Sequence, residues 1–221
     1  MKRSEINAVI RGFEAMLAEH RFALPPFTGF SPAQWAQAGS EWDEVRQAKL
    51  GWDVTDYGLG RYAQTGLALI TLRNGLPGGK PYAEKIMLSG PGQVCPLHFH
   101  WKKTEDIINR GGGELMFELY NADREGRRLD TDVTVRRDGR RVTVAAGRPF
   151  GLKPGESLTL EPYCYHAFYG GASGSVLVGE VSSCNDDDGD NRFFEPIGRF
   201  PAIEEDEPPY RLLCTEYPPA R

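Results

Sequence analysis

Short extended segments separated by glycine and proline fill most of this chain. From Trp52 onward, β-branched and aromatic residues favour strands, and turn residues follow each segment. Asp138-Gly139, between two alternating segments, is typical of a two-residue hairpin turn. Many short strands with close turns predict an antiparallel β-barrel or sandwich. We expect strands over 53–57, 66–73, 82–89, 94–101, 114–120, 132–136, 141–145, 150–152, 157–160, 165–169 and 175–181, with 210–214 as a candidate last strand.

The first fifty residues have a different, helical pattern. Apolar residues recur at helical spacing between Ser4, a candidate N-cap, and about His20. Ser31-Pro32 provides a second helix start, and we expect this helix to reach about Lys49, with an interruption near Gly39. No clean linker separates the two patterns. We therefore expect a single domain over 1–221, with a helical N-terminal arm over 1–51 and a β-barrel over 52–221.

Composition narrows the class of protein. The chain has 221 residues and a net charge of −5, from 26 basic and 31 acidic residues. It has no long basic run, and the arginines around Asp138-Gly139 fit a solvated hairpin tip, so we expect no nucleic-acid partner. We expect no membrane association, because no apolar run approaches a membrane span, and the N-terminus lacks the apolar segment of a secretory signal. Four cysteines without Cys-x-x-Cys spacing favour free thiols, so we expect a cytoplasmic protein.

The segment 92–105 contains the residue types of a divalent-metal site. His98 and His100 are one residue apart, so they point to the same side of a strand. Glu105 can return to the same point across a turn, and His166, in a later aromatic strand, could supply a fourth ligand. Nitrogen and carboxylate ligands fit Mn, Fe, Co, Ni or Zn and leave positions for water or substrate. Most His-x-His pairs are surface or packing residues, but three of the four histidines here fall in this constellation, which favours the metal site.

The spacing of these residues resembles a known superfamily. The pattern G-x5-H-x-H-x4-E over 92–105, followed by glycines and a later strand histidine, resembles the two metal motifs of the cupins. The second motif departs from the usual pattern, since no glycine lies between Pro162 and His166. More specific stretches resemble the D-lyxose ketol-isomerase family, and the similarity runs over nearly the whole chain; these stretches are 82–87, 98–113 and 179–191.

The resemblance carries expectations about fold, activity and cofactor. It implies a mainly β fold, a cupin-type antiparallel β-barrel (jelly roll) behind the N-terminal helical arm. It also implies a manganese-dependent aldose–ketose isomerase that interconverts D-lyxose and D-xylulose, and also D-mannose and D-fructose. The family's metal ligands map onto His98, His100, Glu105 and His166. We expect a homodimer, because such barrels often pair through strand edges and the amphipathic first helix offers an apolar face.

Two charged residues are candidates for catalysis. Lys103 lies between His100 and Glu105 and could stabilise an enediolate oxygen or shuttle protons, a role that the resemblance also favours. Glu180 lies in an apolar strand between valines, so it is either a partnered core group or a working base. The sequence does not decide between these two roles for Glu180.

Three further residues are candidates for contacts with the sugar. The parity of Lys85 in its strand could place it inside the barrel, although an exposed edge lysine is an equal alternative. Trp101 adjoins the proposed ligands and could provide an apolar face for the sugar. Asp190 ends the acidic run 186–190, which either lines the sugar entrance or forms a solvated loop.

These groups suit a sugar that chelates a metal through O1 and O2. The cation would polarise the carbonyl and acidify the C2 proton, and a base would move that proton to C1 through an enediol. A metal-assisted hydride shift is the rival route. The ligand set also permits a mononuclear iron cupin dioxygenase, and a non-catalytic sugar-binding cupin is a third hypothesis.

Overall fold

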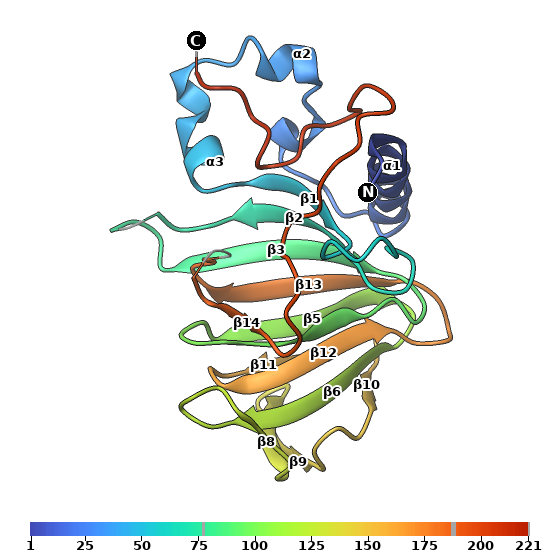
Figure 1. The fold of residues 1–221 in the computed structure, drawn as a ribbon, viewed down its shortest axis with the longest axis vertical. Coiled ribbons are helices and arrows are strands. Elements are labelled where there is room, and N and C mark those ends of the chain that lie inside the picture. Colours follow the sequence, from blue (N-terminus) through green and yellow to red (C-terminus); the bar gives the residue numbers. More distant parts are fainter. Residues whose placement is uncertain (77, 187–188, 221) are drawn as a thin grey trace.

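Two antiparallel sheets curl around a shared apolar core (Figure 1), in a computed structural model that describes residues 1–76, 78–186 and 189–220. Within these residues the larger sheet runs, in spatial order, through β1 (Gly51–Thr55), β2 (Leu67–Arg73), β3 (Tyr82–Ser89), β13 (Val176–Ser183), β5 (Glu105–Gly112), β11 (Ser157–Leu160), β8 (Val133–Arg137) and β9 (Arg140–Val144). The smaller sheet runs through β10 (Phe150–Leu152), β6 (Leu115–Ala122), β12 (Cys164–Gly170), β4 (Cys95–His100) and β14 (Asn191–Phe193), and β7 (Arg128–Leu129) pairs with β6. The expected antiparallel barrel is confirmed.

Strand β2 shows how side-chain alternation divides the apolar residues. Leu67 and Leu69 point into the barrel and join the core between the sheets. Ala68 and Ile70 point outward and pack with the apolar stripe of α1 (Arg3–Glu19). Because both faces are covered, the strand is a nearly continuous apolar segment in the sequence. Any charged residue on the inward face of this sheet is removed from water and needs a partner.

The first helix forms where the apolar spacing predicts it, but its cap differs from the expectation. Lys2, not Ser4, is the N-cap residue of α1. Ser4 lies in the first turn and donates from its backbone N–H and hydroxyl to Asp206, at 2.9 and 2.6 Å. The serine therefore ties the helix to the C-terminal tail, a contact that local sequence cannot reveal.

The expected second helix is broken into short pieces. Ser31 caps the piece that begins at Pro32 as expected, because its Oγ accepts from Gln34 N at 3.3 Å. The backbone of Gly39 is extended and ends any continuous helix there. The pieces of the expected helix are α2 (Pro32–Trp35), η2 (Ser40–Trp42) and α3 (Asp43–Gln47), and one further turn, η1 (Pro26–Gly29), precedes them. Over the described ranges, no helix has the length and apolar character needed to cross a bilayer.

Nearly all expected strands form, with ends shifted by at most two residues. The hairpin turn between β8 and β9 is confirmed: Asp138 and Gly139 have φ of 51° and 77°, as a type I′ turn requires. Strands β5, β7 and β14 were not expected. The candidate strand over 210–214 is wrong, since Leu213 forms only an isolated bridge with Trp52.

The C-terminal tail is held against α1 by polar contacts (Figure 1, red and dark blue). The side chain of Arg3 is 2% exposed, and its Nη2 lies 2.6 Å from Glu205 Oε1 while also pairing with Glu216. Asn7 donates to Pro208 O at 2.9 Å and accepts from Tyr210 N at 2.8 Å. The two ends of the chain therefore stabilise one another.

We expect Arg3→Ala to lower the free energy of unfolding by about 2–4 kcal/mol, because it removes a buried cation that holds two carboxylates. The hydrogen bond from Arg3 lowers the pKa of Glu205, so this carboxylate adds stability above its ordinary value of about 4.3, and that stability is lost as the pH falls. Urea unfolding should therefore show a difference between wild type and variant that shrinks from about pH 5 to pH 3. A difference that is absent at pH 7, or constant with pH, would contradict this interpretation.

Candidate metal centre

Three histidines converge from two neighbouring strands of the smaller sheet. His98 and His100 share the inward face of β4, and His166 on β12 lies directly opposite His98. One ring nitrogen from each lies within 4.8 Å of the others. The alternation of side chains along a strand thus brings the His-x-His pair to one point, as the sequence predicts.

Glu105 reaches the same point from the opposite sheet. After β4 the chain crosses from one sheet to the other, and Glu105 is the first residue of β5. Its Oε1 lies 3.0 Å from His166 Nε2, and its Oε2 lies 3.5 Å from His100 Nε2. The carboxylate and the imidazoles therefore meet inside the barrel.

Backbone carbonyls orient two of the imidazoles. His98 Nδ1 lies 2.7 Å from Pro96 O, and His166 Nδ1 lies 3.0 Å from Cys164 O. A carbonyl oxygen can only accept, so each Nδ1 carries the proton, which leaves Nε2 with its lone pair toward the cavity. Both ring nitrogens of His100 are buried without a hydrogen bond from any residue that the structure describes. This donor set fits a divalent cation held by nitrogen and oxygen.

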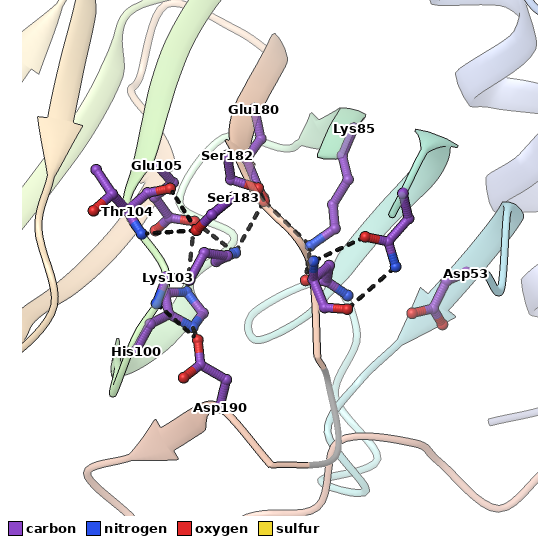
Figure 2. Close-up of polar contacts among 12 residues, drawn as sticks. Asp53, Lys85, His100, Lys103, Thr104, Glu105, Glu180, Ser182, Ser183 and Asp190 are labelled. Atoms are coloured by element: carbon purple, nitrogen blue, oxygen red, sulfur yellow. Dashed lines mark hydrogen bonds and ion pairs between the residues drawn. The ribbon is translucent and has the colours of Figure 1, made fainter. Parts of the chain in front are cut away.

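A chain of buried ion pairs begins at Glu105 (Figure 2). Lys103 Nζ lies 2.8 Å from Glu105 Oε2 and 2.9 Å from Glu180 Oε1. Glu180 Oε1 in turn lies 3.3 Å from Lys85 Nζ and accepts from Ser182 Oγ at 3.0 Å. The cross-strand register places Lys85 directly opposite Glu180 on the inward face of the larger sheet. All these groups are nearly inaccessible to solvent.

Burial and neighbouring charges set the protonation states. Burial lowers the pKa of His98 and of His100, so both imidazoles are neutral at pH 7, the form that binds metal. Burial alone would raise the pKa of Glu105 and Glu180, but their polar neighbours together outweigh it and hold both below their usual range. Lys103 acts on both carboxylates, joined by His100 and His166 at Glu105 and by Lys85 at Glu180. Burial alone would lower the pKa of Lys103, but the two carboxylates raise it. The carboxylates and the lysine are therefore ionised.

The metal-site and ion-pair groups border a cavity of about 50 Å³. One wall is apolar and includes Leu69, Met87 and Phe168. Cys95, three residues before His98 on β4, also lines the cavity. So do four polar residues that the sequence patterns did not single out as candidates: Tyr57, Asn185, Asn191 and Arg199. Only Asn191 had a usable signal, since it directly follows the acidic run and begins β14. The others come from strands and loops distant in sequence.

Comparison with known proteins agrees with this geometry. The family model of D-lyxose isomerase matches residues 1–217. The chain belongs to the D-lyxose isomerase family. The D-lyxose/D-mannose isomerase of Serratia proteamaculans is 54% identical over 98% of both chains, and that of Escherichia coli O157:H7 is 52% identical over 98% of both chains. This protein is accordingly an aldose–ketose isomerase, which favours that hypothesis over the dioxygenase and the non-catalytic binder.

Solved structures confirm the fold of this isomerase. The L-ribose isomerase of Cellulomonas parahominis with L-psicose has a TM-score of 0.57 and 18% identity, covering 92% of this chain and 98% of the other. At that identity the likeness concerns the fold alone. The fold of this chain is the cupin-type barrel that the resemblance implied, with the N-terminal helix present.

The structure separates the sequence-based candidates of the isomerase into two groups. Lys85, Lys103 and Glu180 line the cavity beside the histidines. Trp101 does not: it lies against Phe99 and Tyr163, with ring centroids at 4.7 and 5.5 Å. Trp101 directly follows the inward His100, one residue beyond the end of β4, and is absent from the cavity lining.

Asp190 also lies outside the cavity lining. Its carboxylate accepts from the backbone N–H of Lys102 and Lys103, at 2.8 and 3.1 Å, and lies 3.8 Å from His100 Nδ1. Asp190 thus supports the loop that carries Lys103 and stands behind His100 (Figure 2). Asp187 and Asp188, in the same acidic run, lie outside the described residues.

Proposed function

We propose that this isomerase interconverts D-lyxose and D-xylulose, and also D-mannose and D-fructose, with a divalent metal ion. The observation that carries the proposal is the meeting of three imidazoles and Glu105 beside the Lys103–Glu180 pair in one buried cavity. The names of the relatives supply the sugars. A binding protein would not need a buried carboxylate and ammonium next to the ligand set.

His98, His100, His166 and Glu105 are the proposed metal ligands. When bound, the ion would polarise the sugar carbonyl and acidify the proton on C2. The donor set contains no thiolate, because burial raises the pKa of Cys95 and of Cys164 to about 12 and keeps both thiols protonated. Nitrogen and carboxylate donors suit Mn²⁺, and the choice of manganese follows the family resemblance.

Glu180 and Lys103 are the proposed catalytic residues. The Glu180 carboxylate takes the proton from C2 and returns it to C1, while the proton of the hydroxyl on C2 moves to O1. The Lys103 ammonium stabilises negative charge on the sugar oxygens and can carry this second proton. Lys85 and Ser182 both contact Oε1 of Glu180 and hold its carboxylate in place. We propose Lys85 also as a sugar contact, because it lines the cavity and donates to Asn185 at 2.5 Å. We do not include Trp101, and we assign Asp190 to support of the Lys103 loop.

A ketose assay tests the function directly. Protein stripped by a chelator and reloaded with Mn²⁺ is expected to convert D-lyxose into D-xylulose, and the stripped protein is expected to be inactive. Oxygen consumption in the same reaction, measured with an oxygen electrode, would indicate a dioxygenase. Sugar binding measured by calorimetry without any ketose formation would indicate a non-catalytic binding protein. Either of those last results would remove the isomerase proposal.

Incorporation of solvent deuterium distinguishes the enediol route from the hydride shift. The enediol route exposes the proton on Glu180 to exchange, so we expect deuterium at C1 of the D-xylulose formed in deuterated water. A hydride shift would carry the original hydrogen from C2 to C1. Mass spectrometry showing no deuterium at any extent of turnover would exclude the enediol.

We also propose a single domain that forms homodimers in the cytoplasm. The arm packs through α1 on the outward face of β2, and the C-terminal tail returns to α1, which supports one folding unit. Tyr82 and Val181 are 45% and 43% exposed on adjacent strands of the larger sheet, and this patch suits self-association. Light scattering after size exclusion is expected to give twice the mass of 24.6 kDa.

A further inference from the structure

A second buried ion pair lies on the inward face of the larger sheet. Asp53 on β1 pairs with Leu69 on β2, and Leu69 pairs with Met87 on β3. Leu69 and Met87 both line the cavity, so Asp53 belongs to the same inward row. Asp53 is 4% exposed, and its Oδ2 lies 2.5 Å from Nη2 of Arg199.

Arg199 comes from the segment that follows β14 and reaches back to β1. Its carbonyl oxygen accepts from Thr55 Oγ1 at 2.7 Å, and its guanidinium carbon lies 4.8 Å from the ring centroid of Phe200. Together with the Asp53 contact, these interactions restrain Arg199, and the residue lines the cavity. A side chain restrained in this way can contact a ligand without a large loss of conformational freedom.

This pair lies toward the β1 edge of the larger sheet, away from the proposed catalytic residue on β13. Asp53 is on β1, and two strands separate it from Glu180 on β13 (Figure 2). Aromatic rings line the cavity: Phe193 lies 5.5 Å from His98 and 5.6 Å from Tyr57, measured between ring centroids. A sugar whose C1 and C2 lie at the histidines would extend along these rings toward Arg199.

We propose that Arg199 donates a hydrogen bond to the terminal hydroxyl of the aldose, on C5 of D-lyxose, and that Asp53 positions the guanidinium. The inference rests on the proposed function. Because Asp53 balances the charge of Arg199, the pair presents fixed donors without net charge. That chemistry fits a hydroxyl rather than a phosphate, so the site selects the unphosphorylated sugar.

The test compares D-lyxose with 5-deoxy-D-lyxose, which lacks this hydroxyl, in wild type and in Arg199→Gln. Wild type is expected to prefer D-lyxose by about tenfold or more in kcat/KM, and the variant is expected to lose most of that preference. The two sugars differ in ring forms in solution, but this difference cancels when the preference ratios of the two proteins are compared. An unchanged ratio in the variant overturns the inference.

Two more variants make the test specific. Arg199→Lys keeps the charge beside Asp53 but loses the planar fork, so it is also expected to lower the preference while preserving the fold. Asp53→Asn, which keeps the guanidinium and removes its anchor, is expected to act in the same direction. Arg192→Gln, exposed on β14 and absent from the cavity lining, is the matched control and should retain the wild-type ratio.

The outcomes separate this inference from the function on which it rests. Wild-type turnover with the same preference in Arg199→Lys and Asp53→Asn overturns the inference alone. No ketose from any aldose with metal-loaded wild type overturns both. Metal content and melting temperature are measured for every variant, and equal values show that a lost preference does not come from a damaged metal site.

Discussion

Replacing His166 with alanine is expected to remove most of the bound metal and to lower kcat/KM by more than about 10³-fold. The loss of a residue that merely orients a ligand costs about 10- to 100-fold, and the loss of a ligand costs more. His98→Ala should have a similar effect, since His98 lies directly opposite His166 and both present Nε2 to the cavity. Metal content by elemental analysis and the ketose assay measure the two effects.

His20→Ala is the matched control for both variants. His20 is the only other histidine of the chain, and it lies at the end of α1, away from the cavity lining. The control is expected to keep its metal and its activity. Full metal occupancy in His98→Ala or His166→Ala would mean that the ligand assignment is wrong.

Glu180→Gln is expected to lower kcat by about 10²–10⁴-fold while the metal stays bound. The amide has nearly the shape of the carboxylate but cannot take a proton from C2. Lys103 keeps its contact with Glu105, at 2.8 Å, so the loop beside the ligands retains an ionic partner. The measurement is single-turnover isomerisation together with metal content.

Glu84→Gln is the control for this change. Glu84 precedes Lys85 on β3, its side chain alternates to the other face, and it pairs with Arg73 near the surface. We expect its activity to match wild type. Retained kcat in Glu180→Gln would exclude Glu180 as the base and would leave it as a structural partner of the two lysines.

Local periodicity was enough to predict most strands and the geometry of the His-x-His pair. The same alternation indicates an outward side chain for Trp101, which directly follows the inward His100 at the end of β4 and packs against Phe99. Proximity in sequence to the ligands does not by itself place a side chain in the cavity. Side-chain parity is the better guide within a strand.

Long-range pairing could not be read from the sequence. The ligand pattern predicts that Glu105 and His166 meet, but not that Glu105 arrives from the opposite sheet on β5, a strand whose segment lacks a clear apolar alternation before its glycines. Arg199 and Asp53 are 146 residues apart, and nothing in either local segment indicates the other. The same holds for Arg3, whose partners lie in the acidic tail. Tertiary contacts of this kind decide which charged residues are buried.

The most direct test of the metal centre is anomalous diffraction from crystals of Mn²⁺-loaded protein. We expect one strong peak inside the barrel, within bonding distance of His98, His100, Glu105 and His166. A peak at another place, or a loaded and active protein whose four side chains hold no metal, would contradict the account.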